Sequence, residues 1–239
     1  MTVLFISDLH LTAGDAETTR RFVDFVEGPA RAARELYILG DLFEAWIGDD
    51  DDDPRIAPII DALAGLTANG VPCALMHGNR DFLLGQRFCA LTGCRLLRDY
   101  ERLMLFGQAV LLTHGDLLCT DDTRYMTLRS ELRSPVWQRE FLAKSLDERR
   151  QIASDLRQLS ATEIATKNDY IMDVNQAAVE RTMRDFDVTL LLHGHTHRPA
   201  VHRFDLDARP AARIVLGAWY EQASVVRWTA EGFSLETFG

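Results

Sequence analysis

Five short polar clusters in the sequence carry side chains that bind metal ions, and each cluster follows directly on an apolar run. They read SDLH, GD, HGNRD, THGD and HGHTH, and their candidate ligands are Asp8, His10, Asp41, Asn79, His114, His195 and His197. Carboxylate, imidazole and amide groups without a thiolate favour borderline divalent ions such as Mn²⁺, Fe²⁺ or Zn²⁺. The same residue types exclude a Cys-rich structural zinc site.

Seven ligands exceed what one ion needs, but they would serve two ions about 3.5 to 4 Å apart with one carboxylate between them. Such a pair of ions hydrolyses phosphate esters, because both ions polarise the phosphoryl oxygens and a bridging water becomes hydroxide at neutral pH. A single surface Asp or His is usually structural. Seven of them in five equivalent positions are hard to explain by packing alone, so we expect a phosphoester hydrolase.

The elements that must position these clusters are strands and helices in alternation. Apolar runs predict strands at Val3 to Ile6, Leu36 to Leu39, Val71 to Met76, Val110 to Thr113 and Val188 to Leu192. Helix-like segments at 17–26 and 55–68 separate the first three runs, which is typical of parallel βαβ units. Because ligands gather at the carboxyl ends of strands in α/β sheets, we expect the five clusters at one edge. The short alternating runs after Arg198 predict a mostly antiparallel end to the chain.

Residues 121–186 interrupt this pattern, because they lack strand signals and contain one Pro, no Gly and many helix formers. We interpret them as a helical insertion between two parts of one core, residues 1–120 and 187–239. Six arginines of the insertion are candidates for contact with anionic lipid headgroups: Arg124, Arg129, Arg133, Arg139, Arg149 and Arg150. The acidic run Asp49 to Asp53 is typical of a solvated loop.

Composition narrows the class of protein. A chain of 239 residues with 47% hydrophobic and 26% charged residues is an ordinary globular protein, which excludes disorder, collagen and coiled coil. The formal net charge of -10 argues against a nucleic-acid partner, and no obligate protein partner is evident. No run approaches a membrane span or a signal peptide, so we expect a protein that is not exported and only peripheral membrane contact. The four Cys residues form no CxxC pair, which fits a reducing cytoplasm.

The five clusters resemble the pattern of the calcineurin-like metallophosphoesterase superfamily, D-x-H, G-D, G-N-H-D/E, H and G-H-x-H, over most of the chain. The resemblance implies an α/β fold, an αββα sandwich with a helical lid insertion. It implies that one ion is held by Asp8, His10, Asp41 and His197. It implies that the other is held by Asp41, Asn79, His114 and His195, with Asp41 as the bridge. The sequence departs at Arg80, where much of the superfamily has a His for the leaving group or the phosphate, and this leaves the general acid open.

The departure GNRDF, together with SDLHL, GDLFEAWIGDD, LLTHGD, IMDVN and HGHTHRP, is similar to one branch of the superfamily, the UDP-2,3-diacylglucosamine pyrophosphohydrolases of lipid A biosynthesis. This resemblance implies two Mn²⁺ ions and a peripheral enzyme on the cytoplasmic side of the inner membrane. The implied reaction splits UDP-2,3-diacylglucosamine into UMP and 2,3-diacylglucosamine 1-phosphate (lipid X) by a hydroxide that the two ions activate. The residue type fits, because the guanidinium of Arg80 is always charged and presents N–H donors to a pyrophosphate oxygen in a fixed, planar geometry.

The same branch implies catalytic roles and substrate contacts. Catalysis would involve Asp41, Asn79, Arg80 and His195. The substrate contacts would be Asn79, Arg80, Asp122, Ser160, Ile164, Lys167 and His195. Position 164 is a departure, because the family often has a polar residue there. We also expect the insertion to provide an apolar cleft for two acyl chains, since each buried CH₂ contributes about 0.8 kcal/mol.

Two other functions remain open from the sequence. The chain could be another phosphodiesterase or phosphatase of the same superfamily, acting on phosphoproteins, cyclic nucleotides or nucleic acid. That reading uses the same metals but does not explain Arg80 together with the long insertion. The chain could instead be a non-catalytic interaction protein that keeps the fold as a scaffold, although every ligand position is intact.

Overall fold

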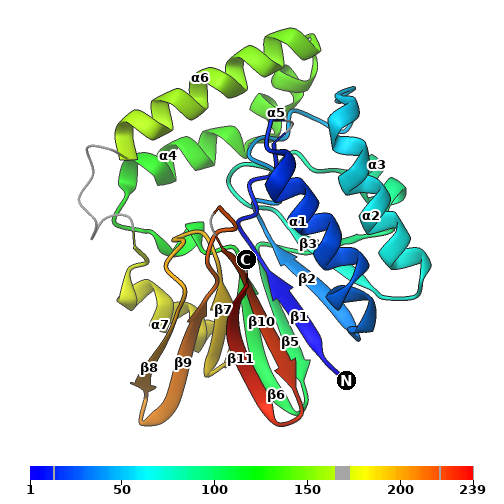
Figure 1. The fold of residues 1–239 in the computed structure, drawn as a ribbon. Helices are drawn as coiled ribbons and strands as arrows, with labels where there is room; N and C mark the ends of the chain where they lie inside the picture. The colour runs from blue at the N-terminus through cyan, green and yellow to red at the C-terminus, as the bar shows by residue number, and fades with distance from the viewer. Residues whose placement is uncertain (13, 165–172, 221, 239) are drawn as a thin grey trace.

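The computed structural model describes residues 1–12, 14–164, 173–220 and 222–238, and in residues 160–164 it describes the main chain alone. Two β-sheets pack face to face at the centre, and helices cover their outer faces (Figure 1). The class is therefore mixed α/β, and the architecture is the αββα sandwich that the sequence predicts.

The first sheet has the strand order β11-β10-β1-β2-β3-β4. Its parallel part is β1 (Val3–Ile6), β2 (Glu35–Leu39), β3 (Cys73–Met76) and β4 (Arg95–Leu96). An antiparallel edge follows in β10 (Ala223–Thr229) and β11 (Gly232–Phe238). The parallel strands all end at one edge of the sheet, which is the edge where the polar clusters begin.

The second sheet has the order β5-β6-β7-β9-β8. It is formed by β5 (Tyr100–Leu105), β6 (Gln108–Thr113), β7 (Leu190–His193), β8 (Ala200–Leu206) and β9 (Arg209–Val215). The strands β6, β7 and β9 are parallel, and the hairpins β5–β6 and β8–β9 close the two sides. The mostly antiparallel C-terminal part that the sequence predicts is confirmed.

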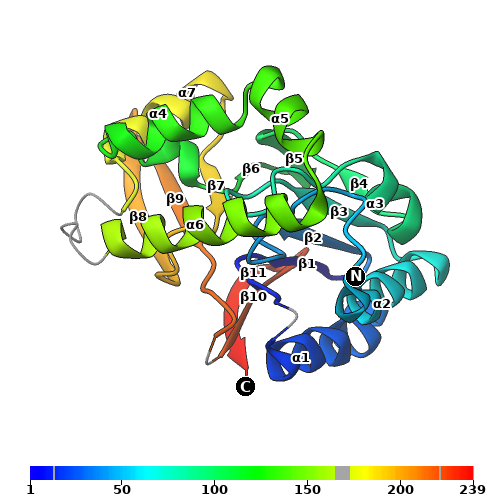
Figure 2. The same ribbon diagram turned by 90° about the horizontal axis from the view of Figure 1, so that it is seen from above.

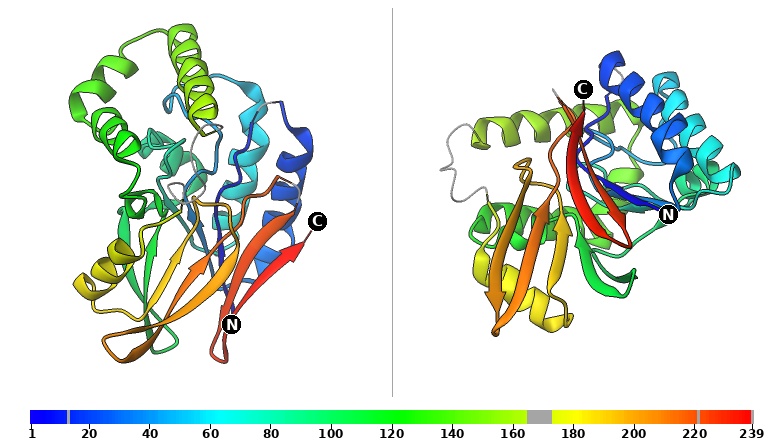
Figure 3. Two further views of the ribbon diagram at one scale, coloured as in Figure 1. Left: turned by 90° about the vertical axis from the view of Figure 1, so that its left-hand side faces the viewer. Right: turned by 60° about the horizontal axis from the view of Figure 1, so that its bottom comes forward.

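Side chains of the strands alternate between the layers. In β1, Val3 and Phe5 point into the core between the sheets, and Leu4 and Ile6 point into the core under the first helices. The helices on that side are α1 (Ala16–Glu27), α2 (Ala57–Ala68) and α3 (Gln86–Thr92), with short 3₁₀ turns at Pro29–Ala32 and Pro54–Ile56. Figure 3 shows the two sheets between α7 (Gln176–Asp185) on one side and α1 and α2 on the other. Neither α3 nor β4 was predicted from the sequence.

Three helices of the insertion form a separate layer at one end of the sheets. They are α4 (Thr123–Leu132), α5 (Pro135–Leu142) and α6 (Leu146–Ile164). A 3₁₀ turn at Asp116–Leu118 precedes them. The N-cap side chains of Asp122 and Ser134 accept hydrogen bonds from the first turns of α4 and α5, which explains where these helices begin. Figures 1 and 2 show α6 crossing over the ends of the strands, as a lid does.

The helix α7 lies in the segment that we assigned to the insertion, yet it packs as the outer layer of the second sheet. Its Val179 and Met183 are fully buried against Leu111 of β6 and Leu191 of β7. Helical spacing in the sequence cannot tell which layer a helix joins. The division into 1–120, 121–186 and 187–239 stays a prediction. Within the segment 121–186, α7 packs with the core.

Arginines of the insertion attach the lid to the core. Arg149 is 2% exposed and donates to both carboxylate oxygens of Asp50, at 2.7 and 2.5 Å, and to the carbonyl oxygen of Ile47. Arg150 pairs with Asp51 and with its neighbour in the acidic run. The interpretation of Asp49 to Asp53 as a solvated loop is therefore wrong, because this run binds α6.

Two further arginines of α4 and its C-cap also pair with core acids. Arg129 lies 2.6 Å from Asp116 and 3.2 Å from Asp99, and Arg133 donates to the carbonyl oxygen of Gly78 at 2.9 Å. The expectation that six arginines form one lipid-facing cluster is wrong, since four of them hold the lid in place. Within the described ranges, no helix is both long enough and apolar enough to span a bilayer.

Candidate metal centre and the adjoining cleft

The seven predicted ligands come from the carboxyl ends of five strands, and the structure brings them together. They follow β1, β2 and β3 of the first sheet and β6 and β7 of the second, and they are Asp8, His10, Asp41, Asn79, His114, His195 and His197. The seam between the two sheets therefore carries all five polar clusters.

One half of the centre consists of Asp8, His10 and His197. The two imidazole Nε2 atoms lie 3.0 Å apart, and Asp8 Oδ1 lies 3.3 Å from His197 Nε2. Asp8 Oδ2 accepts hydrogen bonds from Ser7 Oγ and from the main-chain N–H of His195. Asp8 Oδ1 is buried and has no hydrogen-bond donor among the described residues. A cation among these atoms would satisfy that oxygen.

Asp41 joins this half to the other. Its Oδ2 lies 3.9 Å from His10 Nε2 and 3.7 Å from His114 Nε2, while Oδ1 accepts a hydrogen bond from the main-chain N–H of Arg80 at 2.8 Å. Asn79 Oδ1 lies 3.0 Å from His114 Nε2 and 2.8 Å from His195 Nδ1. One carboxylate thus faces both sets of donors, as a bridging ligand must.

The donor set fits a pair of divalent ions. Asp8, His10 and His197, and likewise Asp8, Asp41 and His114, offer ligand atoms that lie within 4.8 Å of one another. Oxygen and imidazole nitrogen donors suit Mn²⁺, Fe²⁺ or Zn²⁺, and the centre has no thiolate. The assignment of single residues to single ions stays a prediction.

The backbone at the centre is strained. Five of the seven ligands have a left-handed backbone with φ between 51° and 68°: Asp8, His10, Asp41, His195 and His197. Such conformations are uncommon outside glycine, although Asp and His tolerate them better than most residues, and they persist only where the surroundings hold them. Gly78 shows how tight these surroundings are, because a Cβ there would lie 2.0 Å from Asp41 Oδ1.

Outer residues orient the ligands. The second ring nitrogen of His114 bonds the carbonyl oxygen of Leu39 at 2.8 Å, and that of His10 lies 2.8 Å from Glu44 Oε2, so each Nε2 faces the centre. The buried Asp81 accepts from the main-chain N–H groups of Gly78, Asp41 and Leu42. Asp81 therefore ties the loop after β3 to the loop that carries the bridge. We had not singled out Glu44 or Asp81, although both lie inside the motifs GDLFEAWIGDD and GNRDF.

Burial and mutual charge shift the pKa values of the side chains at the centre. Burial alone would raise the pKa of Asp8, but the neighbouring His197, His114 and His10 hold it below its ordinary range. Burial alone would lower the pKa of His114, but Asp41 and Asp8 raise it to about 9. Burial and the charge of His114 lower the pKa of His195 to about 3. Protons on some of the imidazoles therefore balance the carboxylates until cations do so.

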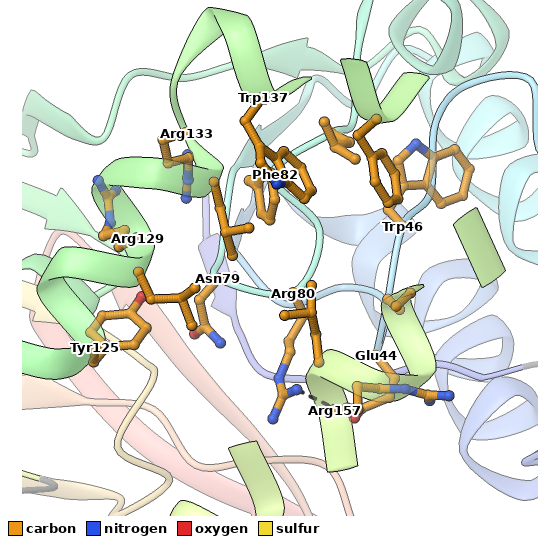
Figure 4. Close-up of a pocket in the computed structure, with 17 residues that line it drawn as sticks. Glu44, Trp46, Asn79, Arg80, Phe82, Tyr125, Arg129, Arg133, Trp137 and Arg157 are labelled. Atoms are coloured by element: carbon orange, nitrogen blue, oxygen red, sulfur yellow. Dashed lines mark ion pairs between the residues drawn. The ribbon is translucent and has the colours of Figure 1, made fainter. Parts of the chain in front are cut away.

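A cleft opens beside the centre, between the lid and the core (Figure 4). It reaches the centre at Asn79 and Arg80, and its far walls are mainly apolar and aromatic. Those walls are Trp46, Phe82 and Leu83 from the core and Leu128, Leu132, Trp137, Phe141 and Leu156 from the lid. The cleft therefore combines a polar end next to the metal ligands with an apolar interior.

The polar end of the cleft contains a network that joins the lid to the centre. The Tyr125 hydroxyl donates to the buried Asp116 at 2.8 Å, and its ring lies 5.9 Å from that of His195. Arg129 pairs with the same Asp116, as described above. Arg80 Nη1 lies 3.9 Å from Glu44 Oε1 at the mouth (Figure 4). The sequence offered no signal for Tyr125, which belongs to no motif.

The lid residues expected to bind substrate are less fully placed. Asp122 caps α4, where its carboxylate accepts from the main-chain N–H of Tyr125 at 3.0 Å. The main chain at Ser160 and Ile164 forms the end of α6, and their side chains lie outside what is described. Lys167 lies outside the described residues altogether. Their roles stay predictions.

Comparison with known proteins identifies the class. Residues 1–199 match the family model of calcineurin-like phosphoesterases. The chain therefore belongs to the calcineurin-like phosphoesterase family. Members of this family use a dinuclear metal centre, and the assembled donors of this chain make it a metal-dependent hydrolase.

The chain is similar to proteins named UDP-2,3-diacylglucosamine hydrolase from Enterobacter sp. (strain 638), Klebsiella pneumoniae subsp. pneumoniae and Escherichia coli. Each is 48% identical over 238 residues, which cover 100% of this chain and 99% of the relative. A solved structure described as a novel archaeal phosphodiesterase is 11% identical, with a TM-score of 0.50 and full coverage of both chains. That likeness shows the shared fold.

Replacing Asp41 by Ala is expected to reduce the number of bound ions below two per chain, because the bridge leaves both sets of donors. The rate should fall by roughly 10²-fold or more, the scale of removing one electrostatic stabiliser. Elemental analysis of the dialysed variant measures the ions. Wild-type metal content with near-normal turnover would exclude a bridging role.

Metal binding is expected to release protons. Since Asp41 and Asp8 raise the pKa of His114 to about 9, its imidazole carries a proton near neutral pH and must lose it to bind a cation. Affinity for Mn²⁺ should therefore rise with pH, by about tenfold per unit for each proton displaced, and level off above about pH 9. Calorimetry in two buffers of different ionisation enthalpy counts the protons, and an affinity independent of pH below 9 would contradict the assignment.

Proposed function

We propose that this protein hydrolyses the pyrophosphate of UDP-2,3-diacylglucosamine to UMP and 2,3-diacylglucosamine 1-phosphate, a step of lipid A biosynthesis. The observation that carries the proposal is the apolar cleft that opens directly on the metal centre and shares Asn79 and Arg80 with it. A substrate with a pyrophosphate next to two acyl chains needs that combination. The names of the relatives support the same substrate.

The cleft has the chemistry for acyl chains. Four tryptophan or phenylalanine rings, Trp46, Phe82, Trp137 and Phe141, contribute to its walls. Each CH₂ that leaves water contributes about 0.8 kcal/mol, so even part of an acyl chain gives substantial binding. A phosphodiester without acyl chains would leave these walls exposed to water. This favours the lipid substrate over the phosphoproteins, cyclic nucleotides or nucleic acid considered from the sequence.

The residues of the chain have separable tasks in this reaction. When bound, two Mn²⁺ ions polarise the phosphoryl oxygens and supply hydroxide at neutral pH. Arg80 lies between the centre and the cleft, and its guanidinium can hold a pyrophosphate oxygen and balance charge that develops there. It cannot serve as the proton donor, because guanidinium does not deprotonate near neutral pH. The lid excludes water from the cleft and carries the proposed contacts Asp122, Ser160, Ile164 and Lys167.

We also propose that the protein works as a peripheral protein on the cytoplasmic side of the inner membrane. The lid supports this, because Val136 and Leu142 on α5 and Leu159 on α6 are 43–54% exposed. A diacylated substrate resides in a bilayer, and exposed apolar side chains beside its cleft favour contact with that surface.

Flotation with vesicles tests the membrane contact. Binding to vesicles should fall in a Val136→Asp/Leu142→Asp variant, because it places charge where the apolar side chains would contact the bilayer. The matched control is Met104→Asp, since Met104 is 61% exposed on the β5–β6 hairpin, far along the sheet from the lid. Equal binding by the wild type and the Val136→Asp/Leu142→Asp variant would remove this part of the proposal.

Release of UMP tests the reaction. The Mn²⁺-loaded protein is expected to form UMP from UDP-2,3-diacylglucosamine, and EDTA should abolish this. Shortening both acyl chains should raise KM progressively, in line with about 0.8 kcal/mol for each buried CH₂ that is lost. If soluble phosphodiesters react as fast as the lipid, the protein is a phosphodiesterase of another kind.

Arg80→Ala is expected to lower kcat/KM by roughly 10²-fold or more, the scale seen when an electrostatic stabiliser is removed. Metal content should stay at the wild-type level, because only the main-chain N–H of Arg80 contacts Asp41. Arg80→Lys should recover part of the rate, since the ammonium keeps the positive charge but lacks the planar set of donors of the guanidinium. Full activity in Arg80→His would argue instead for a proton-donating role.

A further inference from the structure

An exposed aromatic ring that does not line the cleft lies against the metal ligands. Tyr220, in the segment after β9, stacks on the imidazole of His10 with ring centroids 5.3 Å apart and an angle of 16° between planes. It meets His197 edge-on at 5.7 Å and 73°. Although one face covers His10, 58% of the residue remains exposed. Among the described residues it is the one large aromatic side chain so exposed.

The position of Tyr220 is fixed by its neighbours. The preceding Trp219 is fully buried against Phe22 and Phe25, and its main-chain N–H donates to the carbonyl oxygen of Asp8 at 3.1 Å. Arg21 of α1 donates to the carbonyl oxygens of Trp219 and Tyr220 at 3.1 and 3.5 Å. The ring is thus held at the centre from both the core and α1.

Tyr220 and the cleft approach the centre at different ligands. The cleft reaches the ligands at Asn79, and Tyr125 in its wall faces His195. Tyr220 instead contacts His10 and His197, and it does not line the cleft. A substrate cut at its pyrophosphate has two halves that leave the reacting phosphorus in different directions. If the acylated half fills the cleft, the nucleoside half lies outside the cleft, where the ring of Tyr220 is exposed.

We propose that Tyr220 forms the subsite for the nucleoside, with the pyrimidine base stacked on the exposed face of its ring. This inference rests on the proposed function for the identity of the nucleotide. Stacking is suited to this exposed position, because it uses the π-face of a base and does not need buried hydrogen-bond partners. His10 beneath the ring keeps it from rotating away.

Binding of products by the Mn²⁺-loaded protein tests the subsite. UMP and ribose 5-phosphate share the sugar and phosphate, but only UMP has a base. We expect Tyr220→Leu to weaken the binding of UMP by about fivefold or more, which is the lower end of the contribution of a base stacked on an aromatic ring. The affinity for ribose 5-phosphate should stay within about twofold of the wild type. Tyr220→Phe keeps the ring and should bind UMP within about twofold of the wild type. With the full substrate, Tyr220→Leu should raise KM more than it lowers kcat.

Leu was chosen because it keeps an apolar side chain over His10. The metal content of each variant is also measured, and it should equal that of the wild type. Met104→Ala on the distant hairpin is the control for truncating an exposed side chain, and it should change the affinity for neither ligand. Equal weakening of UMP and ribose 5-phosphate would overturn the proposal, because the ring would then act through the metal ligands. Unchanged UMP binding in Tyr220→Leu would overturn it as well.

The two proposals fail separately. A protein that binds UMP through Tyr220 but releases no UMP from UDP-2,3-diacylglucosamine has the base subsite without the proposed substrate. A protein that cleaves this substrate while Tyr220→Leu binds UMP normally has the proposed function without the subsite.

Discussion

The structure depends on the burial of two carboxylates next to each other. Asp8 is fully buried and Asp41 is 2% exposed, and a pair of like charges removed from water is unstable unless cations or protons accompany it. The chain supplies four imidazoles from three different loops around them, which requires both sheets to end at the same seam. The face-to-face packing of the sheets, with Phe5 and Val110 between them, therefore brings the ligand-bearing loops of both sheets to one place.

The backbone at five of the seven ligands is left-handed, in addition to the burial of the two carboxylates. His10 and Asp41 both have a positive φ of 51°, directly after the strands β1 and β2. The hydrogen bonds that Asp81 accepts from the main-chain N–H groups of Gly78, Asp41, Leu42 and Phe43, and the close approach of Gly78 to Asp41, hold this conformation. The centre is in this sense prepared for its ions by the protein.

Much of this could be predicted because it is local in sequence. Apolar runs locate the strands, and the polar residues directly after them locate the centre, so all seven candidate ligands were found together. What failed was long-range. Arg149 and Asp50 are 99 positions apart, and nothing in either segment shows that they pair. Tyr220 and Tyr125 act through their place in space, and a single aromatic residue outside any motif gives no signal. The layer that α7 joins depends likewise on contacts with β6 and β7.

The pairing of the lid with the acidic run changes the electric field that an incoming anion meets. The formal charge of -10 would repel a phosphate-bearing molecule, yet Asp50 and Asp51 are neutralised at short range by Arg149 and Arg150. The mouth and walls of the cleft carry four arginines and one glutamate: Arg80, Arg129, Arg133, Arg157 and Glu44. Opposite charge in a low-dielectric cleft focuses field lines and accelerates diffusional encounter. An acidic protein can in this way steer an anionic substrate to its centre, with an association rate that falls as ionic strength rises.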